Sequence, residues 1–129
     1  MKNIRKKIHV KVEKTTTGFS AYTEREAVYT TAEHTAELYD HLIEGLNLFY
    51  EEEEVYVTKE NLKLSFDLKQ FFQYYRVLNA NFLAERIDMN PTLLSQYVRG
   101  VKNPSQKQTE KIIQGIRAIG KELSDLDLR

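Results

Sequence analysis

The side chains available for chemistry are carboxylates, hydroxyls and three histidines, because the chain has no cysteine. Disulfides, cysteine metal sites and thiol nucleophiles are therefore excluded. His34 and His41 lie seven residues apart, with Glu37 between them, in an expected helix. Zinc-binding histidines on a helix are typically four residues apart, and no cysteine can complete the ligand set. We therefore predict no metal site and no cofactor.

Carboxylates that converge on two metal ions would support nuclease chemistry. Those of this chain are dispersed: Glu13 is expected on the solvent-facing side of a strand, and Glu24 and Glu26 in a turn. A third group follows a helix and is either a solvated charge run or a patch that attracts a cationic protein partner: Glu51, Glu52, Glu53 and Glu54. We expect no catalytic residue and no enzyme, and a metal-dependent nuclease is kept as a further alternative.

The two halves of the chain differ in charge, although the formal net charge of the whole is +0. Residues 1–60 hold eight Lys and Arg against twelve Asp and Glu, a net charge of −4. Residues 61–129 hold eleven against seven, a net charge of +4. Such asymmetry suggests two modules with different partners.

The stretch "NPTLLSQYVRGVKNPS", residues 90–105, lies in the basic half. Asn90 and Pro91 are typical of a helix start, and Gly100 of a helix end. The second pair, Asn103 and Pro104, opens another helix. A helix this short leaves a few polar side chains for its outer surface: Thr92, Gln96 and Arg99.

The first sixty residues predict three strands, a helix and a fourth strand. Ile8, Val10 and Val12 alternate with polar residues, and turn-prone segments divide "IHVKVEKTTTGFSAYTEREAVYTTA" into an antiparallel meander. From Thr35 to about Tyr50, leucines recur at helical spacing. Residues 55–58, "VYVT", predict the fourth strand. The module, residues 1–60, is therefore β-β-β-α-β.

From residue 61 to residue 129 the pattern is helical, in four pieces. Asn79 or Asn81 can cap the second piece, and Ser105 can cap the fourth. The fourth piece carries an apolar stripe with Lys and Arg outside it: Ile112, Ile113, Ile116 and Ile119. The chain is thus expected to be α+β, with a strand-rich module followed by an all-α bundle of the helix-turn-helix kind.

Residues 83–105, "LAERIDMNPTLLSQYVRGVKNPS", resemble the helix-turn-helix core of the phage-repressor and Cro (XRE-type) family. Leu83 and Ala84 match the family's Leu-Ala pair, where the small residue lets two helices cross closely. Met89 matches the apolar turn residue, and Asn90 matches the cap of the recognition helix. The resemblance implies a DNA-binding module that dimerises.

One position departs from the family's pattern, because Asp88 stands where the family usually has a turn glycine. We expect Asp88 to adopt the left-handed conformation, which Asp tolerates better than most residues. In the same register Leu94, Tyr97 and Val98 point inward. The resemblance then leaves three residues on the outer face of the recognition helix, toward the major groove of double-stranded operator DNA: Thr92, Leu93 and Gln96.

These three residues would read bases. Gln96 can donate to and accept from an adenine edge, Thr92 offers a hydroxyl, and Leu93 can pack on a thymine methyl group. Other residues would contact phosphates without reading sequence: Asn79, Arg99, Lys102 and Lys107. The alternative is that Thr92 and Gln96 are ordinary solvated residues of a helix surface.

Three features of the first module are the order of its elements, the hairpin "EKTTTGFSAY" and the segment "TAEHTAELYDHLIEGLNLFYEE". In these features it resembles a HicB-type antitoxin domain, which is a degenerate RNase H-like β-β-β-α-β unit. The family's "PGC" and "GDT" segments are absent, and Thr35 and Glu37 match clearly. In that family this module masks a small mRNA-cleaving toxin, HicA, and the second module represses the operon's own promoter.

The resemblances together imply an antitoxin and autorepressor of a toxin-antitoxin operon, acting as a homodimer or a higher even oligomer. The alternative is a stand-alone regulator whose first module binds another protein. No apolar run approaches the roughly 20 residues of a membrane span, and the N-terminus lacks the apolar stretch of a signal peptide. We therefore expect a cytoplasmic protein with no membrane partner.

Overall fold

The computed structural model describes residues 1–128 and is a mixed α+β structure with five α-helices and two sheets. It divides into two compact units, of which the first is Met1–Asp67 and the second begins at Leu68. The division lies beyond the boundary expected between residues 60 and 61. The charge asymmetry is the same for this division: the first unit holds nine basic and thirteen acidic residues, and the second unit holds ten basic and six acidic residues. Each unit is described below by itself.

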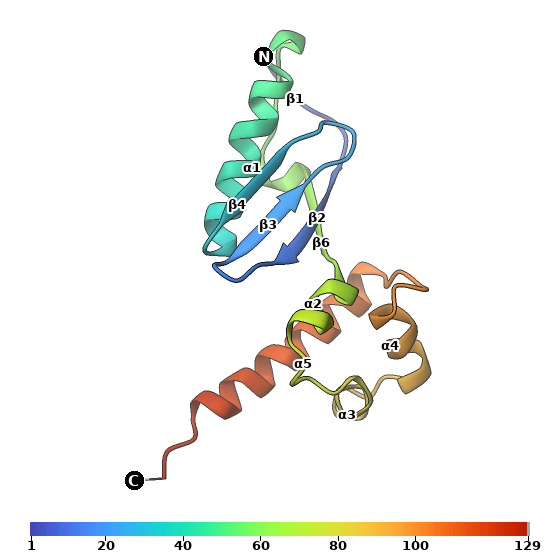
Figure 1. Cartoon of the computed structure of the whole chain (residues 1–129). Coiled ribbons are helices and arrows are strands. Elements are labelled where there is room, and N and C mark those ends of the chain that lie inside the picture. Colours follow the sequence, from blue (N-terminus) through green and yellow to red (C-terminus); the bar gives the residue numbers. More distant parts are fainter. Residues whose placement is uncertain (129) are drawn as a thin grey trace. The chain divides into compact units, whose positions relative to one another are not determined.

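The main sheet of the first unit has four strands in the order β4-β3-β2-β6 (Figure 1). The predicted meander is confirmed: β2 (Ile8–Lys14), β3 (Phe19–Tyr22) and β4 (Tyr29–Ala32) pair antiparallel. Gly18 is the last residue of the turn between β2 and β3. A Cβ atom there would lie 2.2 Å from the carbonyl oxygen of Ala32. Only glycine fits so close an approach of two backbones.

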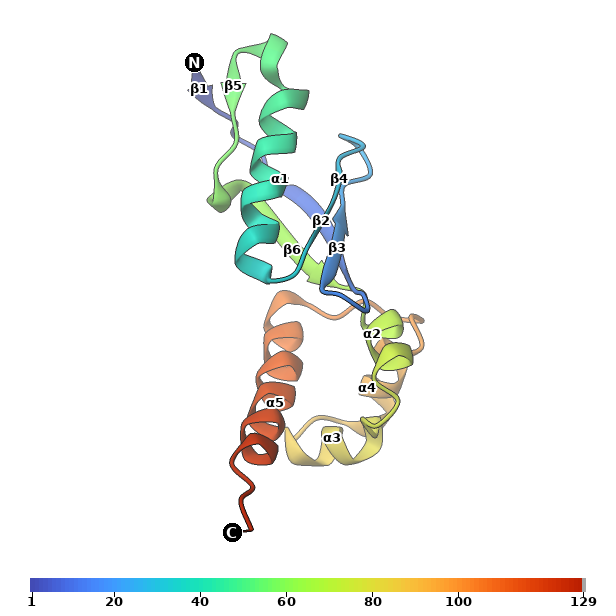
Figure 2. The same cartoon turned by 60° about the vertical axis from the view of Figure 1, so that its left-hand side comes forward.

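Helix α1 (Thr35–Phe49) runs beside the sheet (Figure 2) and confirms the predicted helix. Its Leu38, Leu42 and Leu46 are fully buried, because leucines at this spacing share one face of a helix. They form the core together with the inward-facing residues of the central strand: Ile8, Val10 and Val12. The alternating apolar residues of β2 and the regularly spaced leucines of α1 thus pack into one hydrophobic core.

The fourth strand of the sheet is β6 (Leu62–Phe66), so the expected assignment of residues 55–58 was wrong. Only β5 (Val55–Tyr56) is a strand there, and it pairs parallel with β1 (Lys2–Asn3) in a separate two-stranded sheet. β6 pairs parallel with β2, Ile8 opposite Leu62 and Val12 opposite Phe66. The apolar residues of β6 alternate with Lys63 and Ser65 and pack against the core.

In the segment that connects β5 to β6, asparagine side chains bond to main-chain groups that have no partner strand. The main-chain N–H of Val57 donates to Asn47 Oδ1 at 2.7 Å. Asn61 Oδ1 accepts from the main-chain N–H of Thr58 at 2.9 Å, while its Nδ2 donates to the carbonyl oxygen of Ile4 at 2.9 Å. These bonds satisfy backbone groups that have no ladder partner and explain why the strand predicted at residues 55–58 stops after Tyr56.

The second unit contains four helices, as predicted: α2 (Leu68–Tyr74), α3 (Ala80–Arg86), α4 (Pro91–Val98) and α5 (Gln106–Ser124). Its buried residues come from all four helices and from one turn: Leu68, Phe71, Phe72, Leu83, Ala84, Met89, Leu94, Tyr97 and Ile112. The aromatic cluster of α2 therefore belongs largely to the core, since Phe71 and Phe72 are buried and Tyr74 is 41% exposed.

The predicted caps of the last three helices are confirmed. Asn79 Oδ1 accepts from the main-chain N–H of Phe82 at 3.1 Å, and Ser105 Oγ accepts from that of Gln108 at 3.2 Å. Asn90 caps α4 in the same way. Each cap satisfies main-chain donors that lack a partner within the helix. Within residues 1–128, no helix is both long and apolar enough to cross a membrane.

Candidate nucleic-acid interface

Helix α3 ends in a Schellman motif, which sets the direction in which the chain leaves it. The main-chain N–H of Met89 donates to the carbonyl oxygen of Ala84 at 2.9 Å, and that of Asp88 donates to Glu85 at 3.3 Å. Asp88 has a φ of 56°, so the predicted left-handed conformation is confirmed. This conformation is what the motif requires of the residue after the helix.

The chain then turns directly into α4. Met89 is 7% exposed and anchors the turn in the core. Asn90 Oδ1 accepts from the main-chain N–H groups of Thr92 and Leu93 at 2.8 and 3.2 Å, and Pro91 occupies the first helical turn. Four residues, 87–90, separate the two helices. The connection is therefore short and fixed at both ends.

Helix α5 packs against α3 and the turn that follows it. Gly115 lies so close to α3 that a Cβ atom there would be 2.3 Å from Ile87 Cγ2 and 3.5 Å from Leu83 Cδ1. Lys111 Nζ donates to the carbonyl oxygen of Asp88 at 3.1 Å, and Arg86 forms an ion pair with Glu122. The turn after α3 is thus supported from the neighbouring helix.

The residues predicted to read bases lie on one helix, in positions of unequal exposure. Leu94 and Tyr97 are buried, which confirms two of the three predicted inward positions, whereas Val98 is half-buried. Thr92 is exposed, while Leu93 and Gln96 are half-buried. Because residues three and four apart share a helix face, Thr92 and Gln96 lie on the side of α4 away from its core contacts, whereas Leu93 shares a face with the buried Tyr97.

The residues predicted to contact phosphates are all exposed: Asn79, Arg99, Lys102 and Lys107. The side-chain oxygen of Asn79 is already used as the cap of α3. Arg99 ends α4, Lys102 follows in the connecting segment, and Lys107 lies in the first turn of α5. Three cations at one end of α4, on a unit of net charge +4, can attract an anionic polymer.

The acidic run of the first unit is solvent-exposed. Glu51, Glu52 and Glu53 form a 3₁₀ turn, and Glu54 follows it with a left-handed φ of 55°. Among the described residues no group of three or more His, Asp and Glu is placed to hold a metal ion. His41 Nδ1 instead lies 2.9 Å from the carbonyl oxygen of Thr31, a hydrogen bond between α1 and the sheet.

One carboxylate that sequence reasoning placed in a turn is buried. Glu26 is 5% exposed and accepts a hydrogen bond from the hydroxyl of Tyr50 at 2.8 Å. Burial raises the pKa of Tyr50, and the bond to Glu26 also raises it, while Lys6 beside the ring lowers it. The arrangement joins a loop to the end of α1 and is structural. Nothing in the local sequence separates Glu26 from its exposed neighbour Glu24.

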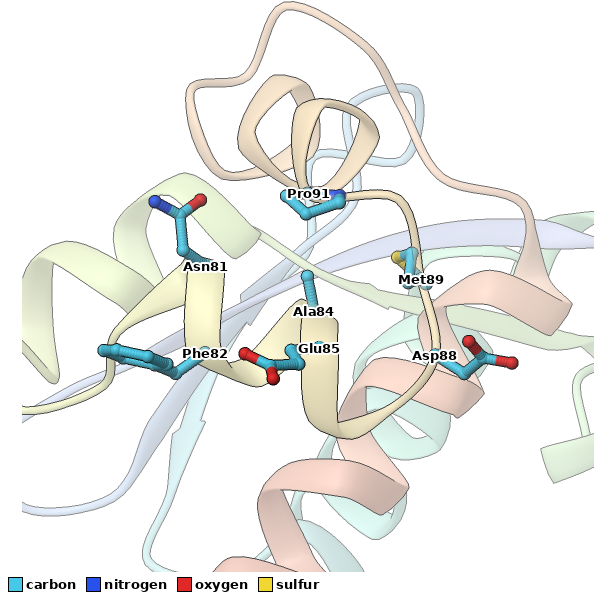
Figure 3. Close-up of a pocket in the computed structure, with 7 residues that line it drawn as sticks. All are labelled: Asn81, Phe82, Ala84, Glu85, Asp88, Met89 and Pro91. Atoms are coloured by element: carbon cyan, nitrogen blue, oxygen red, sulfur yellow. The ribbon is translucent and has the colours of Figure 1, made fainter.

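Sequence reasoning also missed a pocket beside the turn. Phe82, which fits the apolar pattern of α3, is 70% exposed. It borders an open pocket with six other residues (Figure 3): Asn81, Ala84, Glu85, Asp88, Met89 and Pro91. The helical spacing of Phe82 and Leu83 could not tell which of two adjacent apolar residues faces the core.

Comparison of the chain with family models, with curated proteins and with solved structures gives no match.

Proposed function

We propose that the chain is a cytoplasmic, dimeric transcriptional repressor that reads operator DNA through a helix-turn-helix formed by α3 and α4. The observation that carries this proposal is the connection between these helices. Two short helices are joined by residues 87–90, with Asp88 in the left-handed conformation and Asn90 as a cap. Such a connection is the defining feature of the motif, whose second helix enters the major groove.

In this proposal α4 is the recognition helix. Thr92 and Gln96 read base edges, because they lie away from the buried Leu94 and Tyr97. Leu93, at the border of this face, packs on a thymine methyl group. Arg99, Lys102 and Lys107 then contact phosphates and fix the register of α4.

A dimer gives the protein two recognition helices for a palindromic operator, with half-sites about 34 Å apart or a multiple of that distance. The end of the chain supplies an apolar surface for this contact. Leu123 is 62% exposed, Leu126 70% and Leu128 99%. Exposed leucines in succession favour coverage by another protein surface, and a second copy of the chain is the occupant we propose.

The first unit supports a second role, that of a HicB-like antitoxin. The four-stranded sheet and α1 follow the chain order β2, β3, β4, α1 and β6, which is the β-β-β-α-β order of this resemblance, with β5 of the separate two-stranded sheet between α1 and β6. Its exposed glutamates, Glu51 to Glu54, can attract a cationic RNA-binding toxin and raise the rate of association. We propose that this unit masks a HicA-type toxin, while the helical unit represses the operon.

DNA reading is tested by fluorescence anisotropy of the full chain on a duplex from its own promoter and on a scrambled duplex, across a salt series. The Thr92→Ala/Gln96→Ala variant should lose the preference for the promoter and keep its salt slope. Gln114→Ala removes an exposed glutamine from α5 and is the matched control. Equal binding of both duplexes by the wild-type chain would refute the proposal.

The antitoxin role is tested by co-expression with a small basic protein encoded next to this gene. We expect the wild-type chain to co-purify with that protein and to relieve the growth arrest that it causes. Replacement of Glu51, Glu52, Glu53 and Glu54 by Gln should weaken the complex. Failure to relieve growth arrest, with DNA binding intact, would favour the stand-alone regulator.

A further inference from the structure

An apolar pocket lies at the junction of α3 and α4, with a volume of about 620 Å³. Its walls are mainly apolar, formed by Phe82, Ala84, Met89 and Pro91. Figure 3 shows these residues around one hollow, with Pro91 above Ala84 and Met89 beside it. A hollow of this size can receive one long side chain of another molecule.

The ring of Phe82 is the exposed aromatic surface of this pocket. At 70% exposure it leaves most of its surface in water. Its main-chain N–H is held by Asn79, so the start of α3 fixes the backbone that carries the ring. The cap therefore fixes the main chain of α3 at the residue that carries the ring.

Two of the residues that line the pocket are acidic, Glu85 and Asp88. Glu85 follows Phe82 by one helical turn, and Figure 3 shows its carboxylate turned to the side on which the ring lies. The carboxylate of Asp88 points away from the ring in Figure 3, and Lys111 Nζ donates to the main-chain carbonyl oxygen of Asp88. Glu85 therefore supplies the negative charge beside the ring, in contrast to the exposed surface near Arg99.

We infer that this pocket binds an arginine side chain presented by a basic segment of a partner protein. Arginine fits the site in two respects: its planar guanidinium can stack on the Phe82 ring while donating to Glu85, and its aliphatic stem can cover the exposed Pro91. A lysine ammonium is a hydrated point charge and gains less from the ring face.

A protein segment suits the site better than a small cation does. The pocket is open and its carboxylates are solvated, so a single ion pair there contributes little to affinity. Several contacts made by one segment add their effects. Pro91 starts α4, so a bound segment would lie next to the proposed recognition helix. The inference itself does not depend on DNA reading by α4.

The test uses the full chain labelled with ¹³C at its methionine methyl groups. The sequence has two methionines, Met1 and Met89, and only Met89 lines the pocket. The probe is a capped hexapeptide of alternating Arg and Ala, beside the same peptide with Lys in place of Arg. We expect a saturable shift of the Met89 signal, with the Arg peptide binding more tightly than the Lys peptide.

Variants assign this signal to the pocket. Phe82→Ala and Glu85→Gln should each weaken the Arg peptide about threefold to fivefold, and the double variant about tenfold. Both positions are exposed, and Ala and Gln are good helix formers, so folding should be unaffected. Val77→Ala and Glu110→Gln, at exposed positions of the same unit, are the matched controls and should bind as the wild type does.

The inference is overturned if the controls weaken binding as much as the pocket variants, or if the Met89 signal does not move. Equal binding of acetylarginine amide and of the hexapeptide would also overturn it, because the pocket would then take a small ligand. The Thr92→Ala/Gln96→Ala variant should bind the peptide normally, so failure of the proposed DNA reading is distinguishable from failure of this inference.

Discussion

Asp88 and Gly100 occupy equivalent positions at the C-terminal ends of two successive helices. Asp88 follows α3 with a φ of 56°, and Gly100 follows α4 with a φ of 76°. At the second helix, the main-chain N–H of Val101 donates to Gln96 at 2.9 Å, repeating the bond from Met89 to Ala84. The same Schellman geometry is thus built once with the preferred glycine and once with aspartate.

This equivalence predicts opposite effects of two substitutions. Asp88→Gly should raise the free energy of unfolding of the second unit by about 0.5–1 kcal/mol, and Gly100→Ala should lower it by about 1 kcal/mol. A Cβ atom at Gly100 would have only an ordinary contact, 3.4 Å from Lys69 Cδ, so the cost is conformational. Urea denaturation measures both changes. Asp88→Asn removes the charge while tolerating the same conformation, and a large effect of this variant would contradict the explanation.

Two glycines of α5 give a second matched pair. Gly115→Ala places a methyl group 2.3 Å from Ile87 Cγ2, and overpacking of this kind costs about 1–3 kcal/mol. Gly120 has nothing within 4 Å of a Cβ atom, so Gly120→Ala should stabilise the helix by up to about 1 kcal/mol. Thermal denaturation of the two variants tests the packing of α5 on α3. Equal effects of the two substitutions would show that α5 does not pack through Gly115.

Local signals in the sequence were sufficient to place the helix caps of the second unit. Asn79, Asn90 and Ser105 cap helices through bonds that span two or three residues, so their role is visible in a short segment. The left-handed Asp88 was likewise predictable from its place in the turn. For the candidate interface, the inward positions of Leu94 and Tyr97 followed from the register that the resemblance to the phage-repressor family implies.

Features that depend on distant partners were not predictable. β6 pairs with β2, Ile8 opposite Leu62, and a five-residue strand in parallel pairing carries no hairpin signal. The burial of Glu26 depends on Tyr50, which lies 24 residues away. The exposure of Phe82 depends on which side of α3 the other helices cover. In each case packing between elements, rather than local preference, decides the outcome.

The buried contact between Tyr50 and Glu26 predicts a pH dependence. Burial raises the pKa of Tyr50 above its ordinary value of 10.0, so the folded state holds the phenol proton more tightly than the unfolded state. The resulting stability is fully present below pH 10 and is lost as the pH rises through the folded pKa. Tyr22 contributes in the same direction, because burial also raises its pKa.

Tyr50→Phe should therefore reduce the loss of stability of the first unit above pH 10. At pH 7 the same variant should lower the free energy of unfolding by about 1–3 kcal/mol, because Glu26 loses its hydrogen-bond donor while it stays buried. Urea denaturation at pH 7 and at pH 10–11, followed by the methyl NMR signals of Leu38 and Leu42, reports on this unit alone. If the free energy of unfolding of Tyr50→Phe falls above pH 10 as much as that of the wild type, the loss of stability at high pH comes from other tyrosines.

The cations near the end of α4 predict a salt effect that separates them from the base-reading residues. Arg99→Gln and Lys102→Gln should each lower the slope of log K against log salt concentration by roughly 0.9, since each would release one fewer counterion. Both variants should weaken the promoter duplex and a scrambled duplex by the same factor, because phosphate contacts carry no sequence information. Lys121→Gln removes an exposed cation from the far end of α5 and should leave the slope unchanged. A variant at Arg99 or Lys102 that altered the ratio of the two affinities would instead place that side chain at a base edge, and the docking of α4 would have to be reassigned.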